Sequence, residues 1–283
     1  MIPFDFEYYR PGTVESAVSN YQCLERRGKN PVYYGGGTEI ISMARMANIC
    51  TGAVIDIKDI PECNILEIQQ DHLVIGAAVT LTQIHESNLF PLLAQASARV
   101  ADHTIQNKIT LGGNICGTII YREAVLPLLL ADSEVVIAGP KGEKTLPINQ
   151  IFNERLRLEK GELMVQVKIA TSYLSCPYVH VKRTKEDKIN YPLLTICALR
   201  ADKVVRIAFS GLGDFPFRSI EMENELNNNS IPIGERVDKA INITPIPIAS
   251  NLEGSAEYRT FILRNLLTSI VNELGGIASV PNG

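Results

Sequence analysis

The fold of this chain is decided by a stretch that reads Thr104-Ile105-Gln106-Asn107-Lys108-Ile109-Thr110-Leu111-Gly112-Gly113-Asn114-Ile115. Two adjacent glycines lie between a threonine and an asparagine, with apolar residues on both sides. Glycine adopts backbone angles that are closed to other residues, and it lets a flat or charged ligand come close to the main chain. The hydroxyl of Thr110 and the amide of Asn114 would add polar groups at the edges of that approach. The stretch therefore predicts a ligand-binding loop that the rest of the chain supports or covers.

A second glycine cluster, Gly35-Gly36-Gly37-Thr38, follows the apolar run Val32-Tyr33-Tyr34 and precedes a helical pattern over residues 40–47. A strand, a glycine turn and a helix in this order point backbone N–H groups and a helix dipole at an anion. The Rossmann and P-loop motifs are both missing from the sequence. A tight turn without a ligand is the alternative, because glycine clusters mark turns in general. We expect both glycine stretches to converge on one large phosphate-bearing cofactor.

Length and composition exclude several classes of protein. A chain of 283 residues exceeds the usual size of one core, which predicts two or three domains. A formal net charge of -4 provides no basic face for nucleic acid. No run approaches the roughly 18 apolar residues of a membrane helix, and the first residues lack the pattern of a signal peptide. We therefore expect no nucleic-acid partner and no membrane span.

Cysteine and histidine spacing predicts no metal site. The six cysteines are scattered without a C-x-x-C pair, which argues against a zinc site or a cysteine-ligated cluster carried by this chain alone. Scattered cysteines without a leader suit reduced thiols, so we expect a cytoplasmic protein. The four histidines show no metal-ligand spacing.

Strands and short helices alternate along the first 170 residues, which predicts an α+β fold rather than a single βαβ unit. We expect one subdomain at about residues 1–52 and a second at about 53–171. The expected strands cover residues 4–8, 32–34, 53–57, 65–68, 73–76, 134–138 and 163–169. The expected helices follow Thr13 and Thr80 and cover residues 40–47, 90–101 and 124–130.

Residues 172–283 predict a smaller α+β domain with one face of its sheet covered. Strands are expected over residues 178–183, 193–199 and 204–212, with a turn at Asp202-Lys203, and helices over residues 219–226, 233–241 and 255–274. The last helix is expected to bury a face made of Tyr258, Phe261, Ile262, Asn265, Leu266, Ser269, Ile270 and Leu274. We interpret His180 as a core or edge histidine and Asn227-Asn228-Asn229 as a solvated loop.

Several motifs in order along the chain resemble the flavin-binding subunit of the molybdenum hydroxylases, the family of the xanthine and carbon monoxide dehydrogenases. The segment Gly35–Ile41 stands where that family usually has Ala-Gly-Gly-Thr-Asp-Leu-Leu, and Thr110–Asn114 matches its most recognisable signature. Further matching segments are Tyr9-Arg10-Pro11, Ala138-Gly139-Pro140, Leu146-Pro147, Lys160-Gly161-Glu162-Leu163 and Gly254-Ser255-Ala256-Glu257-Tyr258-Arg259. The similarity covers nearly the whole chain.

The resemblance implies FAD, bound without a covalent link between the two subdomains of residues 1–171. The implied fold is the two-subdomain FAD-binding type of the vanillyl-alcohol oxidases, followed by a small α+β domain over residues 172–283. Such subunits pass electrons and do no acid–base work on the organic substrate, so no catalytic residue is expected. The implied cofactor-binding residues are Tyr34, Gly35, Gly36, Gly37, Thr38, Glu39, Ile40, Arg45, Thr104, Ile109, Thr110, Gly112, Gly113, Asn114, Glu123 and Lys182.

Two positions depart from the family pattern. The family often has Ala-Ser-Pro after its Gly-Gly-Asn and an Asp nine residues beyond the Asn, whereas this chain has Cys116-Gly117-Thr118 and Glu123. Arg45 stands where a lysine is common, and its planar fork has a different geometry. The alternatives are a solvated Glu123 in the first turn of a helix and a surface charge at Arg45. For Lys182, which lies on a basic strand followed by Tyr191-Pro192, the alternative is an ordinary charged strand edge.

The resemblance favours an electron-transfer subunit of a hetero-oligomer. Its partners would be a large molybdopterin subunit and a small [2Fe-2S] subunit, and its FAD would pass electrons to NAD or another acceptor. A cofactor-free scaffold or binding protein with the same fold is the alternative, supported by the altered segment from Cys116 to Glu123. A stand-alone flavin oxidase of the aryl-alcohol-oxidase class is a third hypothesis. Those chains are much longer and carry a substrate domain with acid–base residues that this sequence lacks.

Overall fold

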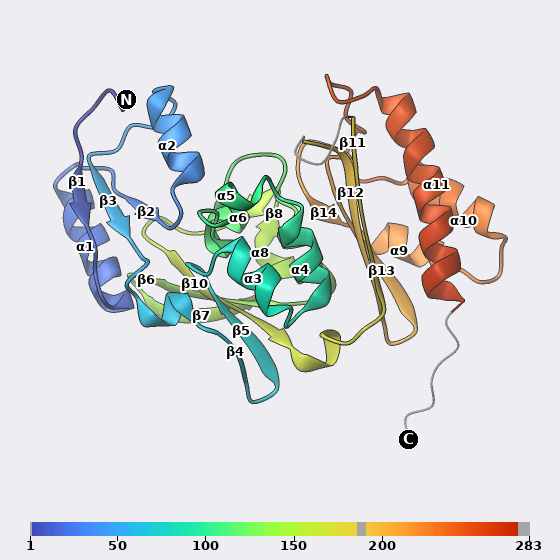
Figure 1. Ribbon diagram of the computed structural model, residues 1–283, viewed down its shortest axis with the longest axis horizontal. Helices are drawn as coiled ribbons and strands as arrows, with labels where there is room; N and C mark the ends of the chain where they lie inside the picture. The colour runs from blue at the N-terminus through green and yellow to red at the C-terminus, as the bar shows by residue number, and fades with distance from the viewer. Residues whose placement is uncertain (1, 186–190, 277–283) are drawn as a thin grey trace.

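The computed structural model describes residues 2–185 and 191–276. Three main sheets follow one another along the chain, and helices pack around them (Figure 1). In strand order they are β1-β3-β2, β4-β5-β10-β6-β7 and β11-β12-β13-β14. The predicted α+β class is confirmed. None of the helices in the described ranges is long and apolar enough to cross a membrane.

The first sheet is parallel and forms the lobe at the left of Figure 1. Its elements are β1 (Glu7–Tyr9), α1 (Val14–Arg26), β2 (Val32–Tyr34), α2 (Thr38–Arg45) and β3 (Ala53–Asp56). The hydroxyl of Thr13 accepts a hydrogen bond from the Ser16 N–H and caps α1, as predicted. Because β3 is the central strand of this sheet, the subdomain boundary expected after residue 52 was wrong: residues 53–56 belong to the first subdomain.

The second sheet is antiparallel, with β10 in its middle. Its strands are β4 (Leu66–Gln69), β5 (His72–Gly76), β6 (Glu134–Gly139), β7 (Gly142–Pro147) and β10 (Leu163–Ala170). The accompanying helices are α3 (Leu81–Ser87), α4 (Pro91–Ala98), α5 (His103–Gln106), α6 (Leu111–Cys116), α7 (Val125–Leu130) and α8 (Ile148–Ile151). A two-stranded ribbon, β8 (Phe152–Asn153) and β9 (Arg155–Leu156), follows α8. The strands expected over residues 65–68 and 73–76 pair as the hairpin β4-β5, and β6 and β7 form a second hairpin.

The third sheet is antiparallel. Its strands are β11 (Tyr178–Thr184), β12 (Pro192–Ala201), β13 (Val204–Ser210) and β14 (Phe217–Arg218), and its helices are α9 (Ile220–Leu226), α10 (Ile233–Asn242) and α11 (Ala256–Gly275). Asp202 and Lys203 both have left-handed backbone angles, φ 51° and 67°, as a two-residue hairpin turn requires. Asn227 exchanges two hydrogen bonds with the backbone of Val205, so the expectation of a merely solvated asparagine loop was wrong.

Both faces of β12 are covered, whereas one covered face was expected. Leu194, Ile196 and Ala198 pack into the core under α9, α10 and α11. Cys197 and Leu199 point the other way, into the core of the second sheet. All six residues of α7 are buried, and this helix packs against β12 and β13. A helix that is apolar on every side can be buried on every side, so α7 joins the second and third sheets.

The buried face of α11 differs from the predicted one. Its buried residues are Arg259, Leu263, Leu267, Ile270, Val271 and Leu274. Tyr258 and Phe261, which we expected inside, are 52% and 59% exposed. Two apolar stripes run along this helix, and helical spacing alone does not say which one meets the sheet. The buried stripe contains Arg259, and a charged residue in a stripe normally indicates a solvent-facing side.

Arg259 is fully buried and crosslinks three parts of the domain that contains the third sheet, which we call the third domain. Its guanidinium donates hydrogen bonds to the carbonyl oxygens of Leu193 and Gly211 and to the side-chain oxygen of Asn251. Leu193 lies at the start of β12, Gly211 directly follows β13, and Asn251 lies before α11. The arginine of the C-terminal family motif therefore holds the third domain together from inside.

We predict that Arg259→Met will lower the free energy of unfolding by about 3 kcal/mol, because the acceptor oxygens stay buried without a donor. Urea unfolding of the purified chain measures this. Arg264→Met on the same helix is the matched control, because its ion pair with Asp238 is about half exposed, and we expect a loss below about 1 kcal/mol. Equal losses in the two variants would contradict the crosslinking role of Arg259.

Candidate cofactor site

The first glycine cluster lies at the carboxyl edge of the parallel sheet. Tyr34 ends β2 and stands opposite Asp56, the last residue of β3. Gly35–Gly37 then turn the chain away from the sheet, and α2 begins at Thr38. Ligands of open parallel sheets bind outside the carboxyl ends of the strands. The predicted strand, turn and helix are therefore confirmed, and they occupy the edge at which a ligand is expected.

The two glycine stretches touch each other directly. A Cβ atom added to Gly36 would lie 1.5 Å from the carbonyl oxygen of Lys108, and one added to Gly35 would lie 2.6 Å from Thr110 Oγ1. Figure 1 shows α2 beside the segment of α5 and α6. The convergence of the two stretches is thus a backbone contact between two subdomains, and it excludes a side chain at Gly36.

The third residue of the first cluster, Gly37, must be glycine because of its backbone angle and its contact with Tyr34. Gly37 has a left-handed φ of 73°, and a Cβ there would lie 2.2 Å from the ring of Tyr34. Tyr34 therefore folds over the glycine that precedes α2. Each glycine of this turn is explained by packing within the chain, so the glycines alone are no proof of a ligand.

Gly112 and Gly113 do not form a loop. Thr110 caps α6 by accepting a hydrogen bond from the Gly113 N–H at 3.1 Å, and both glycines lie in the first turn of that helix without a positive φ. A Cβ on Gly112 would lie 2.9 Å from the carbonyl oxygen of Ala77. The expectation of unusual backbone angles here was wrong. Close packing on Ala77 requires the first glycine, while the second is exposed.

Asn114 leaves a polar atom unsatisfied. Its side chain is 7% exposed, and no described residue donates a hydrogen bond to its Oδ1. An unpaired buried acceptor costs roughly 1–3 kcal/mol, so such groups usually have a partner in the working protein. A ligand that offers an N–H or O–H group beside α6 would supply this partner.

Glu39 bridges the two subdomains next to this point. Its Oε1 accepts a hydrogen bond from the Thr118 N–H at 2.8 Å, and a Cβ on Gly117 would lie 2.4 Å from its Oε2. The carboxylate in the first turn of α2 is therefore engaged with the segment that departs from the family pattern.

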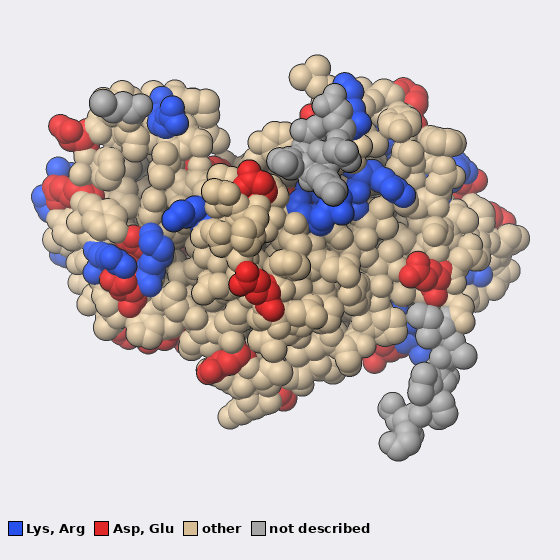
Figure 2. Space-filling view, viewed as in Figure 1, with Lys and Arg blue, Asp and Glu red and all other residues tan. Residues whose placement is uncertain are grey.

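Figure 2 shows a hollow in the surface between the lobe that carries α2 and the lobe of the third sheet, with Lys and Arg side chains on its third-sheet side. Arg183 and Lys185, at the end of β11, are exposed.

The other predicted site residues lie on two helices. Ile40 is half-buried near the start of α2, and Thr104 is exposed on α5. Arg45 is exposed at the far end of α2, roughly 10 Å along the axis from Thr38. That distance favours a surface charge at Arg45.

Glu123 and Lys182 form a buried ion pair. Lys182 Nζ lies 2.9 Å from Glu123 Oε1, and their side chains are 4% and 3% exposed. Lys182 also donates a hydrogen bond to the carbonyl oxygen of Arg99 at 2.7 Å. Neither alternative interpretation holds, because the Glu123 side chain is not solvated and the Lys182 side chain is buried, although β11 is an edge strand. The pair connects the start of α7 to β11 and so joins two domains.

His180 lies two residues before Lys182 on β11. Burial, together with the positive charges of Arg99 and Lys182, lowers the pKa of His180 to about 4. Its ring is therefore neutral at neutral pH, as expected for a packed histidine rather than an acid–base catalyst.

Sequence reasoning missed Arg122. It is 3% exposed and donates hydrogen bonds to the carbonyl oxygens of Gly117 and Glu154, and its guanidinium lies 5.4 Å from the centre of the Phe152 ring. It therefore holds the altered segment from Cys116 to Glu123 against the β8-β9 ribbon. Nothing in the local sequence distinguishes this arginine from a surface one.

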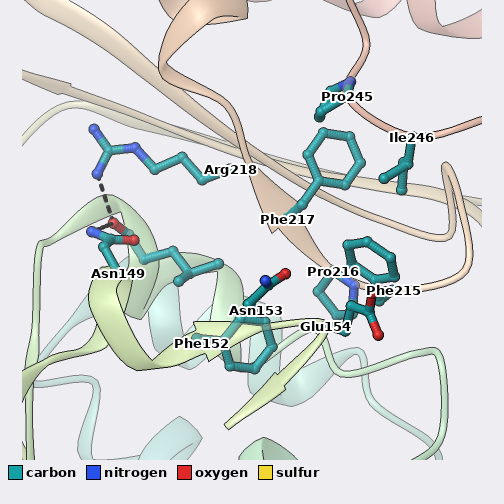
Figure 3. A pocket seen from close by; sticks show the side chains of 11 residues that line it. Asn149, Phe152, Asn153, Glu154, Phe215, Pro216, Phe217, Arg218, Pro245 and Ile246 are labelled. Carbon is teal, nitrogen blue, oxygen red and sulfur yellow. Dashed lines mark hydrogen bonds between the residues drawn. The ribbon is translucent and has the colours of Figure 1, made fainter. Parts of the chain in front are cut away.

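One described cavity lies away from the glycine stretches. It measures about 300 Å³ and lies between the β8-β9 ribbon and β14, with Phe152, Phe217 and Pro245 around it (Figure 3). A second, of about 420 Å³, lies beside Tyr21 and Gly161. The candidate cofactor site is thus distinct from both.

Comparison with known proteins identifies the class to which the chain belongs. A family model described as the FAD binding domain in molybdopterin dehydrogenase matches residues 4–171. This range covers more than half of the chain, so the chain belongs to that family of oxidoreductase domains. The resemblance inferred from the glycine motifs is confirmed.

Two curated relatives match along nearly their full lengths. The xanthine dehydrogenase FAD-binding subunit of Escherichia coli O157:H7 is 25% identical, over 95% of this chain and 96% of its own. The carbon monoxide dehydrogenase medium chain of Hydrogenophaga pseudoflava is 25% identical, over 96% of this chain and 98% of its own.

Solved structures show the same fold over nearly the whole chain. A chain of carbon monoxide dehydrogenase from Hydrogenophaga pseudoflava, in a form that lacks the Mo-pyranopterin moiety, has a TM-score of 0.84 at 23% identity and covers 96% of this chain and 98% of its own. A chain of quinoline 2-oxidoreductase from Pseudomonas putida 86 has a TM-score of 0.83 at 18% identity, with 98% of both chains covered. The third domain, which lies outside the matched family range, is thus part of this fold.

We predict that Gly36→Ala will lower the free energy of unfolding by roughly 2 kcal/mol or more, because its Cβ collides with the backbone of Lys108. Urea unfolding is the measurement. Gly234→Ala is the control: that glycine lies in α10 with nothing within 4 Å, so alanine should leave stability equal or slightly higher. Wild-type stability of the Gly36 variant would show that the contact between the two stretches is loose.

We also predict that Glu123→Gln and Lys182→Met will each cost about 3 kcal/mol, because each leaves a buried charge unpaired. The double variant should lose less than the sum of the two, by about 2 kcal/mol. The same cycle on the exposed pair Lys141 and Glu159 should give no measurable coupling, because solvent screens both charges. Additive losses at Glu123 and Lys182 would argue against a direct ion pair.

Proposed function

We propose that this chain binds FAD noncovalently between its first two subdomains and serves as the electron-transfer subunit of a multi-subunit molybdenum hydroxylase. The observation that carries the proposal is the meeting of the two glycine stretches at the carboxyl edge of a parallel sheet. The unpaired Oδ1 of Asn114, one turn after Thr110 on α6, supports it. This geometry occurs in a chain of the FAD-binding family. The residues present therefore fit the cofactor.

The start of α2 would hold the diphosphate. No described residue accepts a hydrogen bond from the backbone N–H of Gly36 or Gly37, and these groups lie at the positive end of the helix dipole. The acidic residue in the first turn of α2, Glu39, already accepts a hydrogen bond from the Thr118 N–H. A phosphate at the turn therefore meets unpaired donors rather than a free carboxylate.

The start of α6 would lie along the rest of the cofactor. Gly113 is exposed and carries no side chain, which leaves room for a flat ring system. Asn114 offers its unpaired acceptor, while Thr110 holds the helix start in place. Bound FAD would supply the oxidation and reduction chemistry. The residues of this chain bind it and orient it.

The names of the relatives indicate the kind of partner that we propose for this chain. The similar proteins are named as an FAD-binding subunit and as a medium chain, so they work within larger assemblies. By the same logic we propose a large molybdopterin subunit and a small [2Fe-2S] subunit for this chain, in a hetero-oligomer. Electrons would arrive from the clusters and leave to NAD or another acceptor.

A cofactor-free scaffold is the second candidate. It is favoured by the internal explanations for Gly35, Gly36, Gly37 and Gly112, each of which packs against another part of the chain. The unsatisfied Oδ1 of Asn114 disfavours it, because a scaffold gains nothing from a buried acceptor without a donor.

We predict that the purified chain, incubated with FAD and desalted, will retain flavin absorbance in the visible range that bleaches with dithionite. Asn114→Leu removes the unpaired acceptor and should weaken FAD binding by about tenfold, since one hydrogen bond is worth about 1 kcal/mol or slightly more. Asn265→Leu, at an exposed position on α11, is the control and should bind as the wild type does. A folded wild-type chain that retains no flavin would favour the scaffold.

A further inference from the structure

A lysine outside the predicted site lies against the first glycine cluster. Lys58 Nζ donates a hydrogen bond to the Gly35 carbonyl oxygen at 3.0 Å and lies 4.5 Å from the centre of the Tyr34 ring. Lys58 follows β3, whereas Tyr34 ends β2 and Gly35 begins the turn after it. The ammonium group thus reaches across the carboxyl edge of the sheet to the neighbouring strand end.

Asp56 fixes the position of this ammonium group. Its side chain is almost wholly buried at the end of β3, and its Oδ2 accepts hydrogen bonds from Lys58 Nζ at 2.6 Å and from the hydroxyl of Tyr8. Its Oδ1 accepts the backbone N–H of Lys58 at 3.0 Å. A buried carboxylate with three donors is a rigid anchor. Lys58 is therefore held by the sheet, although its side chain is 39% exposed.

The hydrogen bond from Lys58 sets the direction of one peptide group. The peptide between Gly35 and Gly36 is planar and trans, so its C=O and its N–H point in opposite directions. Since the Gly35 carbonyl points to Lys58, the Gly36 N–H points away from it. That N–H meets no acceptor among the described residues. It is one of the groups that would bind the diphosphate.

We propose that Lys58 is a positioning residue of the cofactor site: anchored by Asp56 and Tyr8, it fixes the Gly35 carbonyl and so aims the Gly36 N–H at the diphosphate. This inference rests on the proposed FAD function. Because Lys58 acts on the diphosphate, removal of its side chain should weaken the binding of every ligand that contains a diphosphate. The environment of the flavin ring should not change.

The test compares the dissociation constants of FAD and ADP, measured by isothermal titration calorimetry on the full chain. Lys58→Met should weaken both ligands by the same factor, about tenfold to a hundredfold, because one hydrogen bond from a charged donor is lost. Lys58→Arg keeps a charged donor and should recover part of the affinity. At saturating FAD, the visible flavin spectrum of Lys58→Met should equal that of the wild type.

Two further variants complete the design. Lys29→Met removes a lysine of similar exposure, 37%, that pairs with Glu7 in the same subdomain, and it should bind both ligands as the wild type does. Tyr8→Phe removes the hydrogen bond that the hydroxyl of the exposed Tyr8 donates to Asp56, and it should weaken the binding of both ligands severalfold. It decides the question if Lys58→Met does not fold.

Unchanged affinity in the folded Lys58→Met variant would overturn the inference, and so would a loss for FAD without a loss for ADP. If Lys58→Met does not fold, unchanged binding by Tyr8→Phe would overturn it. A folded wild-type chain that binds neither ligand would overturn the proposed function as well. If the wild-type chain binds both ligands and the Lys58 and Tyr8 variants bind them equally well, only the proposed role of Lys58 would be refuted.

Discussion

The contact between Gly36 and the Lys108 carbonyl is the constraint on which the candidate site depends. Two backbones meet there at a distance that leaves no room for a Cβ atom. The carboxyl edge of the first sheet is thereby placed against the capped start of α6 in the second subdomain. The glycine turn lies against Thr110 because of this contact, and Asn114 follows one helical turn later on α6. Glu39 adds a second link beside it, through the Thr118 N–H.

The third domain is joined to this core by buried polar groups as well as by apolar packing. The ion pair of Glu123 and Lys182 lies where α7 meets β11, and Arg122 ties the preceding segment to the β8-β9 ribbon. Such groups are costly to bury unless their partners are in place, so they favour one arrangement of the domains over others. The end of the segment that departs from the family pattern therefore carries the domain joint, which explains why Arg122 and Glu123 are buried rather than solvated.

Local patterns were dependable where neighbours in the sequence decide the conformation. The caps at Thr13 and Thr80, the turn at Asp202-Lys203 and the strands of the β4-β5 hairpin were predicted and are confirmed. Errors arose where a distant partner decides. The boundary after residue 52 was wrong because β3 inserts between β1 and β2. The face of α11 was wrong because the stripe that carries Leu263 and Leu267 is buried, whereas Tyr258 and Phe261 are exposed. The expectation of unusual backbone angles at Gly112 and Gly113 was wrong because both residues are helical, and Gly112 is required by its close packing on Ala77.

The sequence by itself determined the class of the protein, since glycine motifs in a fixed order carry the family resemblance without any knowledge of contacts. It also determined most strands and helices, because capping, alternation and turn chemistry act over a few residues. Only the tertiary structure decided which groups meet. Lys58 reaches Gly35 from another strand, Glu123 pairs with Lys182 across a domain joint, and Arg259 is buried where an arginine is expected outside. These contacts depend on chain crossings and side-chain directions, and neither is encoded in the spacing of residues along the chain.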